Sequence, residues 1–142
     1  MIASAMPATS TSTVAVEPSA RSWLRLEAVT AFVAGLVLYG IHGGPWLLVL
    51  PLLLVPDISM IGYLRDARLG ALTYNLVHNW AFGLGVLGIG AWAGVDWVIL
   101  AGAVLIAHVG MDRAAGYGLK GASFQDTHLG RIGRHREAAA QS

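Results

Sequence analysis

The chain has 142 residues, enough for one domain, and 56% of them are apolar whereas only 12% are charged. That charged share is about half the roughly 25% of ordinary soluble domains, so the composition is typical of a membrane protein. A formal net charge of +1 excludes a strongly basic surface, and we expect no nucleic-acid partner. The absence of cysteine excludes disulfides, thiolate metal sites and cysteine nucleophiles within the chain.

Residues 1–21 are rich in Ala, Ser, Thr and Pro and contain no continuous apolar run. A secretory signal would need a basic start and an apolar core of about 7–15 residues. We therefore expect a disordered N-terminal tail over residues 1–21. An integral membrane domain over residues 22–133 and a flexible C-terminal tail over residues 134–142 complete the expected organisation.

Four apolar segments follow, at residues 24–41, 46–64, 69–92 and 95–110, and the last helix is expected to continue toward residue 116. Each approaches the roughly 17–25 residues that an α-helix needs to span hydrocarbon. A soluble helix would interrupt such runs with a charged face, so a very apolar soluble bundle is the weaker interpretation. The predicted fold class is all-α: a four-helix transmembrane bundle with a short cytoplasmic C-terminal segment folded back against it.

The basic residues fall on one side of these segments. They precede the first segment, separate the second from the third, and follow the fourth: Arg21, Arg25, Arg65, Arg68, Arg113, Lys120, Arg131, Arg134 and Arg136. The two opposite turns, residues 42–45 and 93–96, have no Lys or Arg. The positive-inside rule therefore predicts a multi-pass protein of the bacterial inner membrane with both termini in the cytoplasm.

Polar side chains gather near the basic ends of the segments. His108 and Asp112 are four residues apart, and Asn75 and His78 are three apart, so each pair shares a helix face. Helix bundles build metal sites from such pairs on facing helices, and imidazole and carboxylate ligands suit zinc, iron or manganese. A hydrogen-bonded pair that only satisfies a buried histidine is the alternative for His108 and Asp112, with similar weight.

The candidate residues of this predicted site fall into three groups. The candidate metal ligands, for a divalent ion such as zinc, are His78, His108 and His128. The candidate catalytic carboxylates, either of which could complete the ligand set, are Asp57 and Asp112. The candidate substrate-binding residues are Asn75, Arg113 and Lys120.

The segment after the fourth helix mixes aromatic, apolar and glycine residues over positions 116–133, unlike a solvated tail. We expect it to fold back against the cytoplasmic mouth of the bundle and to bring His128 near the other candidate ligands. The alternative is a disordered tail, mainly for the part after residue 133.

Five short motifs carry a resemblance to a known family. They are 54–63 (LVPDISMIGY), 74–78 (YNLVH), 108–113 (HVGMDR), 116–120 (GYGLK), and Phe124 with 127–130 (THLG). Together they resemble the uncharacterised bacterial membrane-protein family catalogued as domain of unknown function 4260, over about residues 23–133. Val55 stands where a second leucine is expected. The resemblance implies the membrane fold and marks the polar residues of these motifs, but it implies no reaction.

Three functions compete. The first is a membrane-embedded, metal-dependent enzyme, a hydrolase acting on a lipid-like or other apolar substrate, although no established metal signature such as His-Glu-x-x-His is present. The second is a protein that transports protons or other ions, which would require a homo-oligomer because four helices are few for a transporter. The third is a non-enzymatic scaffold or partner subunit. The sequence leaves open whether the chain is an enzyme, and membrane lipid is the expected partner in each case.

Overall fold

The computed structural model describes residues 18–121 and 126–131 of the chain. Its helices, in chain order, are α1 (Pro18–Ile41), η1 (Trp46–Leu48), α2 (Val49–Leu54), η2 (Val55–Leu64), α3 (Ala67–Val77), α4 (Trp80–Ala93) and α5 (Asp96–Ala115). Two strands of two residues each, β1 (Asp126–Thr127) and β2 (Gly130–Arg131), form an antiparallel pair. Apart from these two short strands, the regular elements of the described chain are helices, which confirms the expected all-α class.

Three continuous helical stretches are long and apolar enough to cross a membrane: Ser19–Ile41, Trp46–Leu64 and Asp96–Ala115. The second of these joins η1, α2 and η2 without an interruption, despite its two prolines. Helices α3 and α4 make a fourth span if the bent pair is counted as one, and their axes differ by 44°. The chain thus has three or four candidate spans, which agrees with a multi-pass membrane protein.

Two boundaries differ from the sequence expectation. The first helix begins at Pro18 and not near residue 24, because proline is well tolerated in the first turn of a helix and the residues after it are good helix formers. The third segment, expected as one helix over residues 69–92, breaks at His78 and Asn79. Residues 18–21 of the expected N-terminal tail thus belong to α1, whereas residues 1–17 of that tail and the expected C-terminal tail at residues 134–142 lie outside the described residues.

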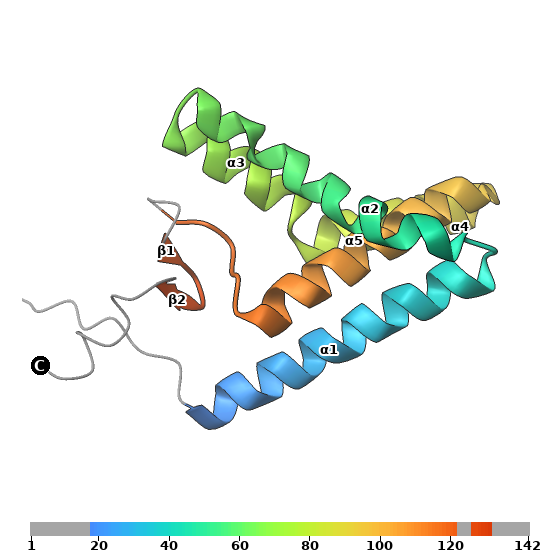
Figure 1. Cartoon of the computed structure of the whole chain (residues 1–142), viewed down its shortest axis with the longest axis horizontal. Coiled ribbons are helices and arrows are strands. Elements are labelled where there is room, and N and C mark those ends of the chain that lie inside the picture. The colour runs from blue at the N-terminus through green and yellow to red at the C-terminus, as the bar shows by residue number, and fades with distance from the viewer. Residues whose placement is uncertain (1–17, 122–125, 132–142) are drawn as a thin grey trace, which may run out of the picture.

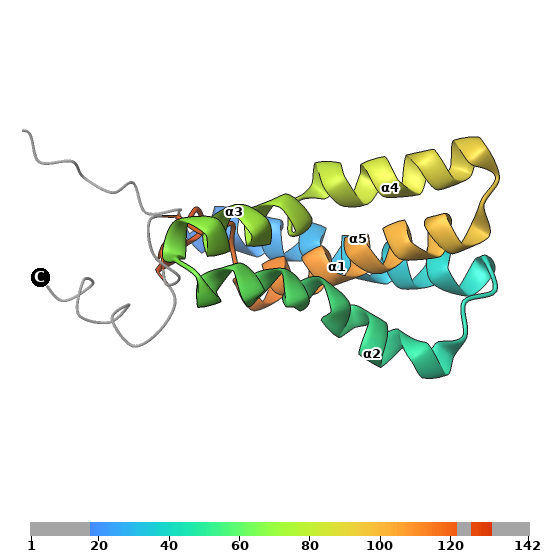
Figure 2. The same cartoon turned by 90° about the horizontal axis from the view of Figure 1, so that it is seen from above.

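Helix α5 runs through the middle of the molecule, with α1 along one side and α4 along another (Figures 1 and 2). More buried residues lie on α5 than on any other helix of the described chain. Glycine permits the closest approach: a methyl group at Gly35 of α1 would lie 2.7 Å from the carbonyl oxygen of Ala103 and the nitrogen of Ala107 on α5. Close backbone contact of this kind stabilises helix pairs in lipid, where no hydrophobic force drives them together.

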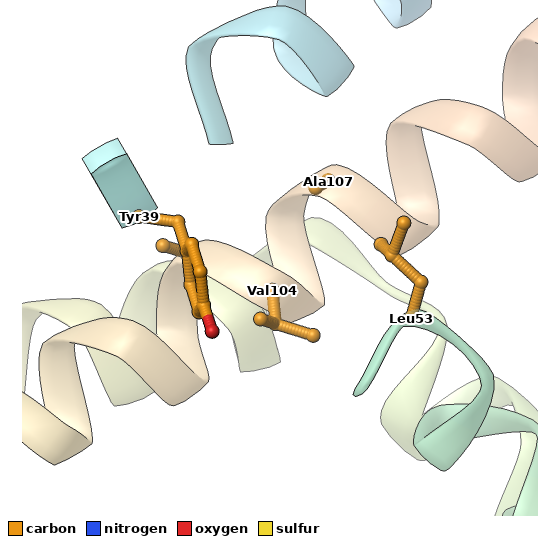
Figure 3. Packing of buried hydrophobic residues seen from close by; sticks show 5 residues of the cluster. Tyr39, Leu53, Val104 and Ala107 are labelled. Carbon is orange, nitrogen blue, oxygen red and sulfur yellow. The ribbon is translucent and has the colours of Figure 1, made fainter. Parts of the chain in front are cut away.

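The apolar core lies where α1, α2 and α5 meet. Tyr39 of α1, Leu53 of α2, and Val104 and Ala107 of α5 pack together in it, as Figure 3 shows. Most other large apolar side chains are exposed, including Val37 on α1 and Leu50 on α2. An apolar exterior around a small core is what a protein solvated by lipid requires.

The polar and basic residues gather at one end of this arrangement. The start of α1, the turn between η2 and α3, and the end of α5 all lie at the same end, whereas the turns before η1 and before α5 lie at the other (Figure 2). The Lys and Arg residues of the described chain belong to the first end. Trp46, Trp92 and Trp97 are exposed beside the turns of the second end.

Candidate metal centre

Two buried histidines from different helices meet side by side. His78 stands at the end of α3, and His108 lies on α5; both side chains are fully buried. Their Nε2 atoms are 2.9 Å apart, and the rings meet edge to face. The structure therefore brings together two of the three histidines that the sequence marked as candidate ligands.

Each of these rings donates through Nδ1 to a backbone carbonyl. His78 Nδ1 lies 2.9 Å from the Tyr74 oxygen, and His108 Nδ1 lies 2.6 Å from the Leu53 oxygen. A carbonyl oxygen only accepts, so both Nδ1 atoms carry hydrogen. In the neutral rings both Nε2 atoms then carry lone pairs that face each other. Two such lone pairs repel at 2.9 Å, and a metal ion or a proton between or beside them would remove this repulsion.

Two carboxylates approach the same pair of nitrogens. Asp57 Oδ1 lies 3.4 Å from His78 Nε2 and 3.6 Å from His108 Nε2. Asp112 Oδ2 lies 3.9 Å and 3.8 Å from the same two atoms. The Tyr74 hydroxyl donates to this Asp112 oxygen at 2.9 Å, and its ring stacks on His78. Both candidate catalytic carboxylates therefore belong to the cluster.

Because Pro56 has no N–H, the Leu53 carbonyl is free to orient His108. The backbone passes from α2 into the 3-10 helix η2 at Val55, whose N–H already donates to the Leu52 carbonyl three positions back. For the next carbonyl, that of Leu53, the residue three positions on is Pro56, which has no N–H to donate. The Leu53 carbonyl accepts from His108 instead. Asp57 follows directly in the first turn of η2, so this stretch of the chain supplies both the carbonyl and the carboxylate.

Asn79 produces the break that places His78. Its side-chain oxygen caps α4 by accepting from the Phe82 N–H at 2.9 Å, and its amide donates to the Asn75 and Leu76 carbonyls at the end of α3. The Phe82 N–H would otherwise pair with the His78 carbonyl, which is now free. Arg113 donates to that carbonyl at 2.8 Å. One asparagine thus ends one helix, begins the next and exposes the backbone between them.

The candidate substrate-binding residues tie the C-terminal segment to the helices. Asn75 donates to the Lys120 carbonyl at 2.9 Å and accepts from the Lys120 N–H at 2.7 Å. Arg113 donates to the Tyr117 carbonyl as well as to His78, and it forms no fork with Asp57 or Asp112. The Lys120 ammonium lies 5.0 Å above the Tyr74 ring, and burial lowers the pKa of Lys120.

His128 is the candidate ligand that the structure does not bring to the pair. Its Nδ1 accepts from the Leu119 N–H at 2.8 Å, and its side chain is only partly exposed to solvent. Partial burial lowers the pKa of His128, and the positive charge of Arg113 lowers it further. Asp57, His78 and His108, without His128, form a group of described residues whose ligand atoms all lie within 4.8 Å of one another.

The donor set fits a divalent transition metal. Zinc takes imidazole nitrogen at about 2.0–2.1 Å and carboxylate oxygen at about 2.0–2.2 Å, which places neighbouring ligand atoms roughly 3–4 Å apart. The two Nε2 atoms lie 2.9 Å apart, and each lies 3.4–3.9 Å from the nearest oxygens of Asp57 and Asp112. Histidine ligands also donate their second ring nitrogen to a carbonyl or carboxylate, as both rings do here. Polar groups that were not among the candidate site residues, Tyr74, Asn79 and the Leu53 carbonyl, complete the surroundings.

A comparison with family models supports the resemblance noted from the motifs. The model described as "Domain of unknown function (DUF4260)" matches residues 21–132, which is most of the chain. No match is found among the curated proteins or among the solved structures.

Proposed function

This chain belongs to the DUF4260 family, and we propose that it is a membrane protein that binds one divalent metal ion through His78, His108 and Asp57. Asp112 stands beside the ion as fourth ligand or as the base that takes a proton from bound water. One observation carries this proposal: two Nε2 lone pairs face each other at 2.9 Å while both Nδ1 hydrogens are held by carbonyls.

The chemistry that this site supports is hydrolysis of a lipid-like or other apolar substrate. A divalent metal lowers the pKa of its bound water to about 7, which supplies a nucleophile at neutral pH. A metal held by His78, His108 and Asp57 would activate water for hydrolysis. A bond from the water oxygen to the acyl or phosphoryl centre would replace the bond to the leaving alcohol, and Asp112 would pass the water proton to the leaving oxygen. Asp57 is 42% exposed and Asp112 only 14%, so substrate would approach from the Asp57 side.

The proposed placement in the membrane follows from the charge distribution. The end with the basic residues faces the cytoplasm, in the inner membrane of a bacterium, with both termini on that side. Helices α3 and α4 then act as one broken span of a four-helix domain. Residues 116–121 form a cytoplasmic segment held by Asn75 and Arg113, which supports a role for these two residues in closing the site from water.

The second candidate function is proton handling, and the same distance favours it. A separation of 2.9 Å is a normal hydrogen-bond length, so one proton held between the two imidazoles would also satisfy both rings. A scaffold with a purely structural cluster is the third candidate. Metal content separates these functions from the first, because a protonated pair or a structural cluster needs no metal.

The test is elemental analysis of detergent-purified protein, isolated through an affinity tag that contains no histidine. We expect close to one zinc, iron or manganese ion per chain. The variants His108→Ala and Asp57→Asn should lose the ion, whereas His42→Ala should keep it. His42 is the matched control because it is a histidine at the opposite end, paired with Asp96 at 3.5 Å. Metal-free wild-type protein, or equal metal in all variants, would remove this function and leave proton handling or scaffolding.

A further inference from the structure

An apolar cavity of about 420 Å³ lies between η1, α2, η2 and α5. Its volume falls within the roughly 300–1,000 Å³ of ordinary small-molecule sites. Figure 2 shows the ribbon of α2 turning away from α5 toward the end opposite the basic residues, which is where the cavity is found. Tyr39 and Trp97 line it at that end, and the Tyr39 hydroxyl already donates a hydrogen bond to the Pro45 carbonyl. The cavity walls therefore favour hydrocarbon over any polar ligand.

The residues that line the other end of the cavity are close in sequence to two of the proposed metal ligands. Val55 and Pro56 line it from η2, and the next residue in the chain is Asp57. Val104 and Leu105 line it from α5, and Val104 precedes His108 by about one helical turn, roughly 6 Å. The same short stretches of η2 and α5 thus supply the inner wall of the cavity and two of the proposed metal ligands, Asp57 and His108.

We propose that this cavity holds the hydrocarbon chain of a single-chain lipid whose polar head group lies at Asp57, His78 and His108. This deepens the proposed function and rests on it for the role of the head group. The chain would extend from the metal centre toward the opposite end of the molecule, where Tyr39 and Trp97 line the cavity. Along α5 the lining reaches from Leu105 back to Trp97, eight residues or roughly 12 Å of helix, which suits an extended chain and not a compact ring system.

Two photoreactive fatty acids test this arrangement in full-length protein held in phosphatidylcholine nanodiscs. One carries a diazirine next to the carboxylate, and the other carries it at the end of the chain. After irradiation, peptide mass spectrometry locates the labels. We expect the first probe to label the inner wall around Val55 and Leu105, and the second to label the outer end around Tyr39 and Trp97.

Filling the cavity should abolish this pattern. Ala101 lines the cavity, so Ala101→Phe should cause loss of label at its walls, and Val55→Phe tests the opposite wall if the first variant does not fold. Ala91→Phe adds the same ring to an exposed position of α4 and should leave the label unchanged. Label that is identical for the two probes, or that survives both cavity-filling variants, would overturn the inference.

Metal analysis of the same wild-type samples separates this inference from the proposed function. Position-dependent label in metal-free wild-type protein would uphold the chain site and remove the metal-dependent reaction. Bound metal without position-dependent label would do the reverse, since it would leave the metal centre in place and remove the chain site.

Discussion

His78 and His108 are 30 positions apart in the chain, yet their Nε2 atoms lie 2.9 Å apart because each ring is fixed from behind by a carbonyl. The His108 ring is fixed by a carbonyl that Pro56 leaves free, and the His78 ring is fixed at the helix end that Asn79 creates. The change from α-helix to 3-10 helix at Val55 in one span and the break at His78 and Asn79 in another thus face a third, unbroken helix. Broken helices in membranes expose backbone groups only where protein or a ligand satisfies them, which is why such breaks mark binding sites.

Removing the cap at Asn79 should weaken both folding and metal binding. Asn79→Ala removes the acceptor of the Phe82 N–H and should cost about 1 kcal/mol of stability, as lost caps do. Because the same side chain ends α3, His78 should also lose its position and the metal its affinity. Thermal unfolding in detergent and metal titration measure the two effects.

Asp66→Ala is the matched control for that variant. Asp66 caps α3 by accepting from the Leu69 N–H at 2.8 Å, at the other end of the helix from His78. We expect a similar loss of stability with metal affinity unchanged. Equal loss of metal in both variants would mean that general destabilisation, and not the break, is responsible.

Asn75 should control the closure of the C-terminal segment. Its side chain makes two hydrogen bonds with the Lys120 backbone, together worth about 1–3 kcal/mol. Asn75→Ala should therefore increase opening of this segment by about 5- to 150-fold. Hydrogen exchange of the Lys120 amide measures it. Asn75→Asp keeps the acceptor of the Lys120 N–H and should show a smaller effect; unchanged exchange in Asn75→Ala would contradict the closure.

The contact between His128 and Leu119 should depend on pH. The His128 Nδ1 accepts the Leu119 N–H and can do so only without its own proton, and burial lowers the pKa of His128 in the folded chain. The contact is therefore fully stabilising above the ordinary histidine pKa of about 6.5. It should be lost as the pH falls below that value through the lower pKa of the folded state.

Hydrogen exchange of the Leu119 amide at pH 7.5 and pH 5.5, corrected for the intrinsic rate, measures this dependence. Protection should be greater at the higher pH. The variant His128→Gln cannot titrate and should show no such difference. Protection that rises on acidification would show that the charged ring is the one that binds.

Topology can be tested by reporter fusions. Fusions after Ile41 and near Trp97 should report the periplasm, and a fusion after Gly133 should report the cytoplasm. The physical reason is the placement of Lys and Arg at one end of the helices. A periplasmic C-terminus would mean that α3 and α4 do not together cross the membrane.

The sequence predicted the helices well because length and hydrophobicity decide which segments enter lipid. It also predicted that Asp57, His78, His108 and Asp112 converge, because charge placement puts their helix ends at one level. It missed the break at His78, because a lone asparagine inside an apolar run is a weak signal. It misplaced His128, whose position depends on how the segment after α5 turns, and no periodic pattern describes that turn.

X-ray absorption spectroscopy of the purified protein, recorded at the edge of whichever metal it contains, tests the central claim most directly. The account predicts two imidazole nitrogens and one or two carboxylate oxygens at about 2.0–2.2 Å if the metal is zinc, with no thiolate sulfur because the chain has no cysteine. The imidazole scattering should disappear in His108→Ala. A metal bound by oxygen alone, or imidazole scattering that survives this substitution, would contradict a metal centre built on His78 and His108.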